Sequence, residues 1–113
     1  MLSKSSSGLD LYNAVTMLIS QIQQLLRQSE TQMANPFRSP AEVMVTITEE
    51  LGEVTKEVSL LERIGSKAGW ECEPSRERLS EELLHLLNMV FVLANRYDID
   101  LESAYQRYWN DEQ

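Results

Sequence analysis

Two short segments of this 113-residue sequence are rich in acidic side chains. The first contains Glu49, Glu50 and Glu53, and the second contains Glu82 followed by His85. Carboxylates that lie close together repel one another and are costly to remove from water, and a bound cation relieves both effects. Magnesium prefers oxygen ligands and often shares its coordination shell with substrate phosphates. The two segments are therefore candidates for one site that binds a divalent cation and a phosphorylated ligand.

The spacing of the first group indicates where its side chains point if the segment is a helix. Each helical residue advances by about 100°, so Glu50 lies about 60° and Glu53 about 120° from the apolar position Ile47. Glu49 points nearly away from that apolar stripe. Glu50 and Glu53 are therefore expected at the edge of the face that packs on a neighbouring helix.

The second group repeats this arrangement. Glu82 lies about 100° and His85 about 160° from the apolar position Leu83. When two amphipathic helices pack, residues at the edge of each stripe line the groove beside the contact. Glu50 and Glu53 can then face Glu82, with His85 further out. The alternative interpretation is that these acids belong to solvated helix surfaces, where adjacent glutamates are common.

Four helices are predicted to position these residues. The segment that begins at Ser39 has a capping serine, a proline at the first helical position and, in Glu42, a carboxylate placed to bond back. Gly65 is a plausible end for that helix, and Asp100 can cap the last one. The helices are expected over residues 10–29, 40–64, 75–97 and 101–109.

The predicted fold class is all-α, a helical bundle of three long helices and one short helix. Residues 1–8 are expected to form a flexible tail and residues 9–113 a single helical domain. The apolar stripe of the first helix, from Leu11 to Leu26, favours self-association, because a short helical chain often completes its core against a second copy.

The composition excludes several classes of function. A formal net charge of −8, from 18 acidic and 10 basic residues, disfavours binding to nucleic-acid polymers but still permits one small phosphorylated ligand held through cations. Cys72 is the only cysteine, so the chain forms no internal disulfide and offers no cysteine-based zinc site. No apolar run reaches the about 20 residues of a membrane span. No membrane partner is therefore expected, and a cytoplasmic location is the default.

The acidic segments resemble the motifs of MazG-like nucleotide pyrophosphohydrolases. The signature of that family is Glu-x-x-Glu, a spacer, and then Glu-x-x-Asp. Glu50 and Glu53 match its first half, and Glu82 matches the first position of its second half. The similarity extends over roughly residues 37–109. The segments that carry it are 47–58, 79–87 and 93–104.

The resemblance implies an all-α fold that forms a homodimer or a dimer of dimers. It also implies cleavage of a nucleoside triphosphate to the monophosphate and pyrophosphate with Mg²⁺, or with Mn²⁺ in its place. Glu50, Glu53 and Glu82 would hold the metal. Glu49 would be an extra ligand or the base that activates water, so Glu49 and Glu53 are the expected catalytic positions.

Further residues are candidates for substrate contacts. Lys56, Arg78 and Arg96 are expected to contact phosphates, with ordinary surface charge as the alternative. Phe37 and Trp70 are candidates to stack on a nucleobase, with a core or interface role as the alternative.

The sequence departs from the family pattern at His85, where the family has an aspartate. A neutral imidazole adds no negative charge and favours softer metals such as Mn²⁺, Co²⁺ or Zn²⁺ over Mg²⁺, which leaves His85 as the fourth expected metal ligand. Leu84, just before it, replaces a small residue and narrows the expected groove. Two functional hypotheses follow: a hydrolase with an altered metal site, or a degenerate member that binds a nucleotide or a protein partner without catalysis. A third is a plain helical assembly protein.

Overall fold

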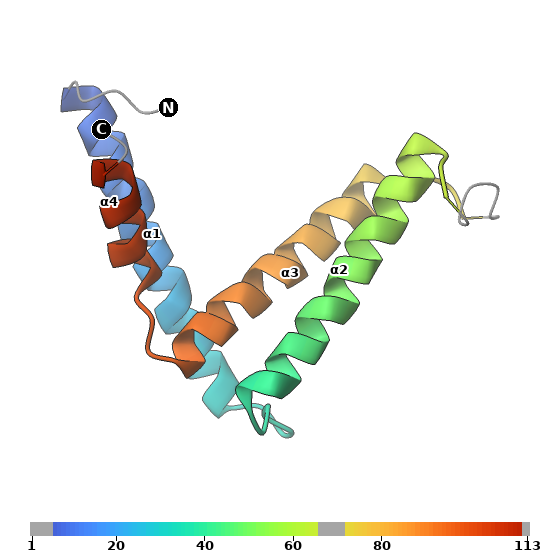
Figure 1. Cartoon of the computed structure of the whole chain (residues 1–113), viewed down its shortest axis with the longest axis horizontal. Helices are drawn as coiled ribbons and strands as arrows, with labels where there is room; N and C mark the ends of the chain where they lie inside the picture. Colours follow the sequence, from blue (N-terminus) through green and yellow to red (C-terminus); the bar gives the residue numbers. More distant parts are fainter. Residues whose placement is uncertain (1–5, 66–71, 112–113) are drawn as a thin grey trace. The chain divides into compact units, whose positions relative to one another are not determined.

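The computed structural model describes residues 6–65 and 72–111, and that part of the chain forms four helices and no strand (Figure 1). The predicted all-α class, with three long helices and one short one, is confirmed. Within the described residues, none of the helices is apolar over a long enough stretch to cross a membrane. The helices are α1 (Ser6–Thr31), α2 (Pro40–Glu62), α3 (Arg76–Arg96) and α4 (Leu101–Asp111).

The start of α2 follows the predicted local signals. The side chain of Ser39 accepts a hydrogen bond from the backbone N–H of Glu42 at 3.4 Å, and Pro40 occupies the first turn. The Glu42 carboxylate in turn accepts a hydrogen bond from the backbone N–H of Arg38 at 2.7 Å. The reciprocal bond thus goes to the residue before the cap, so the capping motif includes one residue more than predicted.

The end of α2 comes slightly before its predicted position. Arg63 adopts a left-handed conformation with φ of 56°, and the N–H of Ile64 donates to the carbonyl of Ser59 at 3.0 Å. This pairing is the usual closure of a helix by a left-handed residue. The helix therefore ends at Glu62, ahead of Gly65, which also has a positive φ of 72°.

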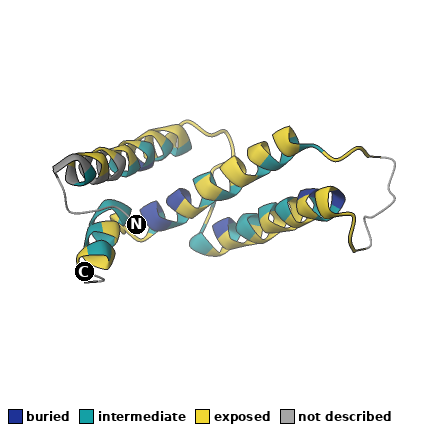
Figure 2. Cartoon of the chain, turned by 90° about the horizontal axis from the view of Figure 1, so that it is seen from above, coloured by how far each residue is buried: buried dark blue, intermediate teal, exposed yellow. Residues whose placement is uncertain are grey.

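The chain divides into two compact units. The single domain predicted over residues 9–113 extends over both of them. The unit Phe37–Leu93 contains α2 and most of α3, which lie side by side (Figures 1 and 2). Its most buried apolar side chains include Val43 and Leu60, near the two ends of α2. The middle of the seam, the line along which α2 and α3 contact each other, is therefore formed by other residues, and several of these are acidic.

The other unit, Met1–Pro36 with Ala94–Gln113, contains α1 and α4. Its centre is an amide pair, because Gln23 and Asn95 are both buried and the Gln23 Nε2 donates to the Asn95 Oδ1 at 2.9 Å. The Gln23 Oε1 also accepts the backbone N–H of Leu101 at 3.0 Å. Buried amides are stable only when they are hydrogen-bonded, so this network fixes α1 against the start of α4.

The helix boundaries in this unit follow local chemistry. Asp98 takes a left-handed φ of 53° after α3, and Asp100 caps α4 by accepting the backbone N–H groups of Glu102 at 3.0 Å and Ser103 at 3.4 Å. The other oxygen of Asp100 accepts a hydrogen bond from the Ser103 hydroxyl at 2.8 Å. That hydrogen bond is the main reason that the pKa of Asp100 is lowered from its ordinary value. The predicted cap of the fourth helix is confirmed. At the other end, α1 begins at Ser6, so residues 6–8 of the predicted tail are helical, and residues 1–5 lie outside the described part.

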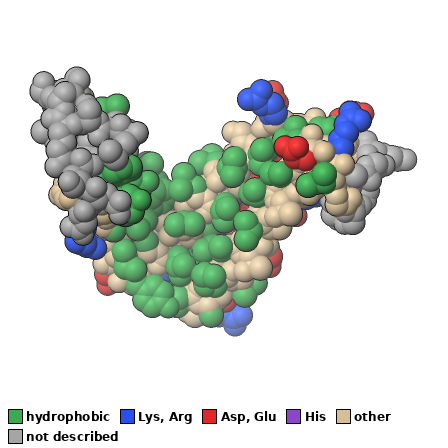
Figure 3. Space-filling model, turned by 45° about the horizontal axis from the view of Figure 1, so that its top comes forward, with side chains coloured by type: hydrophobic (Ala, Val, Ile, Leu, Met, Phe, Trp, Pro, Cys, Tyr) green, Lys and Arg blue, Asp and Glu red, His purple; other side chains and the backbone are tan. Residues whose placement is uncertain are grey.

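Each long helix also carries exposed apolar side chains at seven-residue spacing. Figure 3 shows many hydrophobic side chains exposed on the surface. Seven-residue apolar spacing is typical of helices that pack along a seam with another helix. The exposed rows are Leu11, Leu18 and Leu25 on α1, Met44, Leu51 and Val58 on α2, and Leu83 and Val90 on α3.

Candidate metal centre

Three potential metal ligands meet across the seam between α2 and α3. Glu50 comes from α2, and Glu82 and His85 come from adjacent turns of α3. The His85 Nδ1 lies 3.8 Å from the Glu50 carboxylate and 3.7 Å from that of Glu82. One ligand atom from each residue lies within 4.8 Å of the others. Two ligands on opposite sides of a cation with bonds of about 2.1 Å are about 4.2 Å apart, so small side-chain movements suffice to fit a divalent ion.

The electrostatics of this cluster favour a cation. The side chains of Glu50 and Glu82 are only 24% and 21% exposed, whereas that of His85 is 55% exposed. Burial raises the pKa of Glu50, and the hydrogen bond and negative charge of Glu82 raise it further, while His85 acts in the opposite direction. The folded chain therefore holds the charged form of Glu50 at a cost, which a bound cation would relieve.

The sequence pattern explains why carboxylates occupy this seam. Glu50 and Glu57 are seven residues apart on α2, and Glu82 and Met89 are seven apart on α3. Seven-residue spacing places both members of each pair on the same side of a helix, at positions that helix seams usually fill with apolar residues. Acidic side chains at such positions require a compensating partner.

Glu57 has that partner within the chain. Its side chain is 1% exposed, and the Arg78 Nε donates to its two carboxylate oxygens at 3.1 and 3.3 Å. The Lys56 Nζ lies 3.6 Å from the same carboxylate. Glu50, one heptad earlier, faces Glu82 and His85 instead. Sequence reasoning missed the pairing of Glu57 with Arg78, although the heptad spacing marks Glu57 as a seam position.

The remaining predicted acids lie outside the cluster. The carboxylate of Glu53 is 51% exposed and pairs with the Lys56 Nζ at 3.2 Å. The hydrogen bond that Lys56 donates to Glu53 is the main cause of the raised pKa of Lys56. Glu49 is exposed on α2, in agreement with its predicted orientation. The structure therefore brings together Glu50, Glu82 and His85 but directs Glu53 toward the next turn.

The three predicted phosphate contacts all have carboxylate partners. Lys56 and Arg78 pair with Glu57, as described above. Arg96 belongs to the other compact unit, where its Nε donates to the Glu30 carboxylate at 2.8 Å. A phosphate group would have to displace these carboxylates from the basic side chains in order to bind.

The predicted contacts around the substrate are only partly described. Phe37 is half-buried just before α2, and Trp70 lies outside the described residues. Leu84 is 55% exposed, so its side chain extends from the surface of α3 next to His85.

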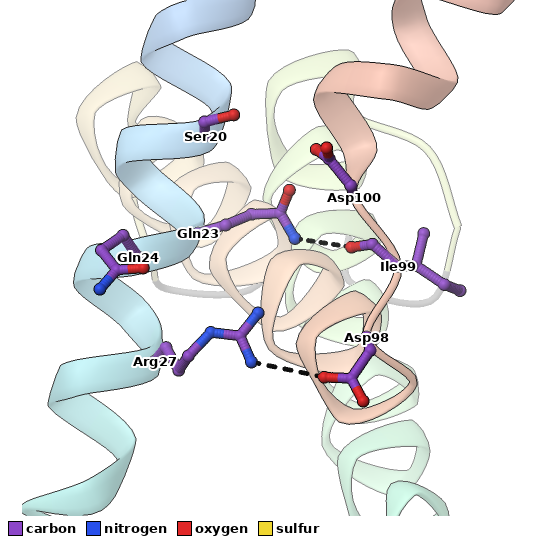
Figure 4. Close-up of a pocket in the computed structure, with 7 residues that line it drawn as sticks. All are labelled: Ser20, Gln23, Gln24, Arg27, Asp98, Ile99 and Asp100. Atoms are coloured by element: carbon purple, nitrogen blue, oxygen red, sulfur yellow. Dashed lines mark hydrogen bonds and ion pairs between the residues drawn. The ribbon is translucent and has the colours of Figure 1, made fainter.

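A polar hollow of about 240 Å³ lies in the unit that contains α1 and α4 (Figure 4). An ion pair between Arg27 and Asp98, 3.7 Å apart, crosses part of it, and the Gln23 Nε2 donates to the Ile99 carbonyl at 3.0 Å. These polar groups satisfy one another, so the hollow is explained by the packing of α1 on the turn before α4. Its lining residues are Ser20, Gln23, Gln24, Arg27, Asp98, Ile99 and Asp100.

Comparison with known proteins gives one informative similarity. The chain is 37% identical over 76 residues to an uncharacterized protein of Bacillus subtilis (strain 168), YpjD. The matched segment spans 67% of this chain and 66% of YpjD, so it covers just under two thirds of the relative's length. No family model matches the chain. No solved structure matches it either.

Proposed function

We propose that the protein is a metal-dependent nucleotide pyrophosphohydrolase of the MazG-like type, which cleaves a nucleoside triphosphate to the monophosphate and pyrophosphate. The observation that carries this proposal is the partly buried carboxylate of Glu50, which faces the carboxylate of Glu82 across a helix seam. Two carboxylates that face each other in a partly buried site repel each other, and a cation between them relieves that repulsion. The resemblance of both helices to the acidic motifs of that family supplies the reaction.

Glu50, Glu82 and His85 are the residues that would hold the ion. Two carboxylates and one imidazole suit Mn²⁺ better than Mg²⁺, because Mg²⁺ prefers a set of oxygen ligands only. Mg²⁺ remains the ion that the family resemblance implies. When bound, a divalent cation polarises a phosphoryl oxygen and lowers the pKa of a coordinated water.

The chain's own side chains would orient the substrate and accept protons. The half-exposed Glu53 carboxylate lies one turn beyond Glu50, which suits it to accept the proton of an attacking water. Glu49, exposed on the same helix, is the second position for that role. Lys56 and Arg78 both pair with the Glu57 carboxylate and would contact the substrate's phosphates in its place.

Pyrophosphate release from a panel of nucleoside triphosphates tests the proposal. We expect turnover with Mn²⁺ or Mg²⁺ that is lost in Glu50→Gln and in Glu82→Gln. Glu81→Gln is the matched control, because Glu81 is the exposed neighbour of Glu82 on α3. Absence of hydrolysis by the folded wild-type protein with both ions, over the whole panel, would refute the catalytic proposal.

One feature favours a second candidate function, in which the protein binds a nucleotide or a protein partner without turning it over. His85 takes the place of the family's aspartate, and two of the predicted phosphate contacts, Lys56 and Arg78, are both paired with Glu57. In that case a nucleotide together with Mn²⁺ raises the melting temperature and no product accumulates. Product in excess of the protein concentration excludes this alternative.

The proposal includes a homodimer or a dimer of dimers. Exposed apolar rows at seven-residue spacing on α1, α2 and α3 support it, because a second copy would cover them. Light scattering after size-exclusion chromatography measures the mass of the assembly. A mass near the 13.0 kDa of one chain at micromolar concentration would contradict this part of the proposal.

A further inference from the structure

We infer that Lys56 is a positioning residue that holds Glu53 away from the metal centre, and that a bound cation competes with Lys56 for the Glu53 carboxylate. This inference rests on the metal-binding part of the proposed function. It means that the affinity of the site for its ion depends in part on Lys56, a residue that is itself no metal ligand.

The position of Glu53 on α2 allows two partners. Glu50 lies three residues before it and Lys56 three residues after it, and helical residues at this spacing have neighbouring side chains. Side chains on a helix lean toward its N-terminus, which by itself favours an orientation of Glu53 toward Glu50. The Glu53 carboxylate lies instead 3.2 Å from the Lys56 Nζ.

Charge explains that orientation. Glu50 and Glu53 lie one turn apart on the same helix, and like charges at this spacing repel each other. Attraction to Lys56 and repulsion from Glu50 both direct Glu53 away from the cluster. A divalent cation at the cluster removes the second effect, because its two positive charges neutralise the carboxylates of Glu50 and Glu82. Glu53 would then turn toward the ion and bring a third carboxylate beside it, where that carboxylate can accept the proton of a coordinated water.

Lys56 is itself held in place by a second carboxylate. Its Nζ lies 3.6 Å from the carboxylate of Glu57, which is 1% exposed and receives the Arg78 Nε on both of its oxygens. Loss of the Lys56 ammonium group would therefore leave Glu57 with a bonded partner. The chain with Lys56→Met should fold, which makes the inference testable by substitution.

A double-mutant cycle on the full chain tests the inference, with Mn²⁺ as the probe and calorimetry as the readout. We expect Lys56→Met to tighten Mn²⁺ binding by about two- to fivefold, the factor that corresponds to the loss of one exposed ion pair. In the Glu53→Gln background the same substitution should change nothing, because the carboxylate for which Lys56 competes is gone. Lys56→Arg, which keeps the cation, should retain the wild-type affinity.

Two outcomes overturn the inference. Equal tightening in both backgrounds would mean that Lys56 acts only through its general positive charge, and an unchanged affinity in Lys56→Met would mean that it does not compete. Arg38→Gln is the matched control, because Arg38 forms a comparable ion pair of 3.1 Å with Glu42 in the first turn of α2. Its removal should leave the Mn²⁺ affinity unchanged.

The same titrations separate this inference from the proposed function. If the wild type binds Mn²⁺ and Glu50→Gln does not, the metal centre stands, and the cycle alone decides the role of Lys56. If the wild-type protein binds no Mn²⁺, the metal centre and the role of Lys56 are both refuted. Circular dichroism melts of each variant confirm that a change in affinity is measured on folded protein.

Discussion

The substitution Glu50→Gln should stabilise the protein at neutral pH in the absence of divalent ions. Glutamine keeps the shape of the side chain and its capacity to hydrogen-bond to Glu82 but removes the charge. Burial and Glu82 raise the pKa of Glu50 in the folded state above its ordinary value of 4.5. For an acid, a raised folded-state pKa means that stability falls as the pH rises from 4.5 through that higher value. Above this window the charged Glu50 destabilises the fold.

The magnitude follows from the geometry of the cluster. Two unit charges at the largest separation in the cluster, 4.8 Å, repel by about 1 kcal/mol at the dielectric constant of water and by about 3.5 kcal/mol at an effective value of about 20. The two carboxylates are 24% and 21% exposed, which places them between these limits. His85 offsets part of the repulsion. We therefore expect a gain of about 1 to 2 kcal/mol in the free energy of unfolding.

Urea unfolding followed by circular dichroism, with EDTA and at low salt, measures this gain. The difference between Glu50→Gln and wild type should be largest at pH 7 and should shrink as the pH falls toward 4.5, because wild-type Glu50 becomes protonated. Glu81→Gln, on the exposed side of α3, should show no such dependence. A Glu50→Gln protein that is less stable than wild type at pH 7, or a difference independent of pH, would refute the reasoning.

Three further predictions concern the neighbours of this cluster and the second unit. Arg78→Met should lower the free energy of unfolding by about 2 to 4 kcal/mol, because the buried Glu57 loses its main partner, and a urea midpoint equal to that of wild type would contradict this. His85→Asp should raise the affinity for Mg²⁺ relative to Mn²⁺, as measured by calorimetry, and an unchanged ratio would place His85 outside the metal's coordination shell. Gln23→Leu should cost about 1 to 3 kcal/mol, because the backbone N–H of Leu101 loses its acceptor in a packed site. Thermal melts of that variant that match wild type would show that water replaces the lost hydrogen bond.

The sequence by itself determined the helices and the face on which the acids lie. The caps at Ser39 and Asp100 depend on residues only a few positions away, so local hydrogen-bonding rules located both helix starts. The helical repeat likewise placed Glu50 and Glu82 at facing edges, because orientation around a helix depends only on residue number. Both features follow from contiguous sequence and need no knowledge of the fold.

Only the tertiary structure decided which partners these side chains take. His85, expected further out, lies within 4 Å of both carboxylates, whereas Glu53, expected beside Glu50, pairs with Lys56. The angle of a residue around its helix does not determine the rotamer of a long side chain. That choice depends on charges brought close by the neighbouring helix and along the same seam, and these are known only once the two helices are packed together.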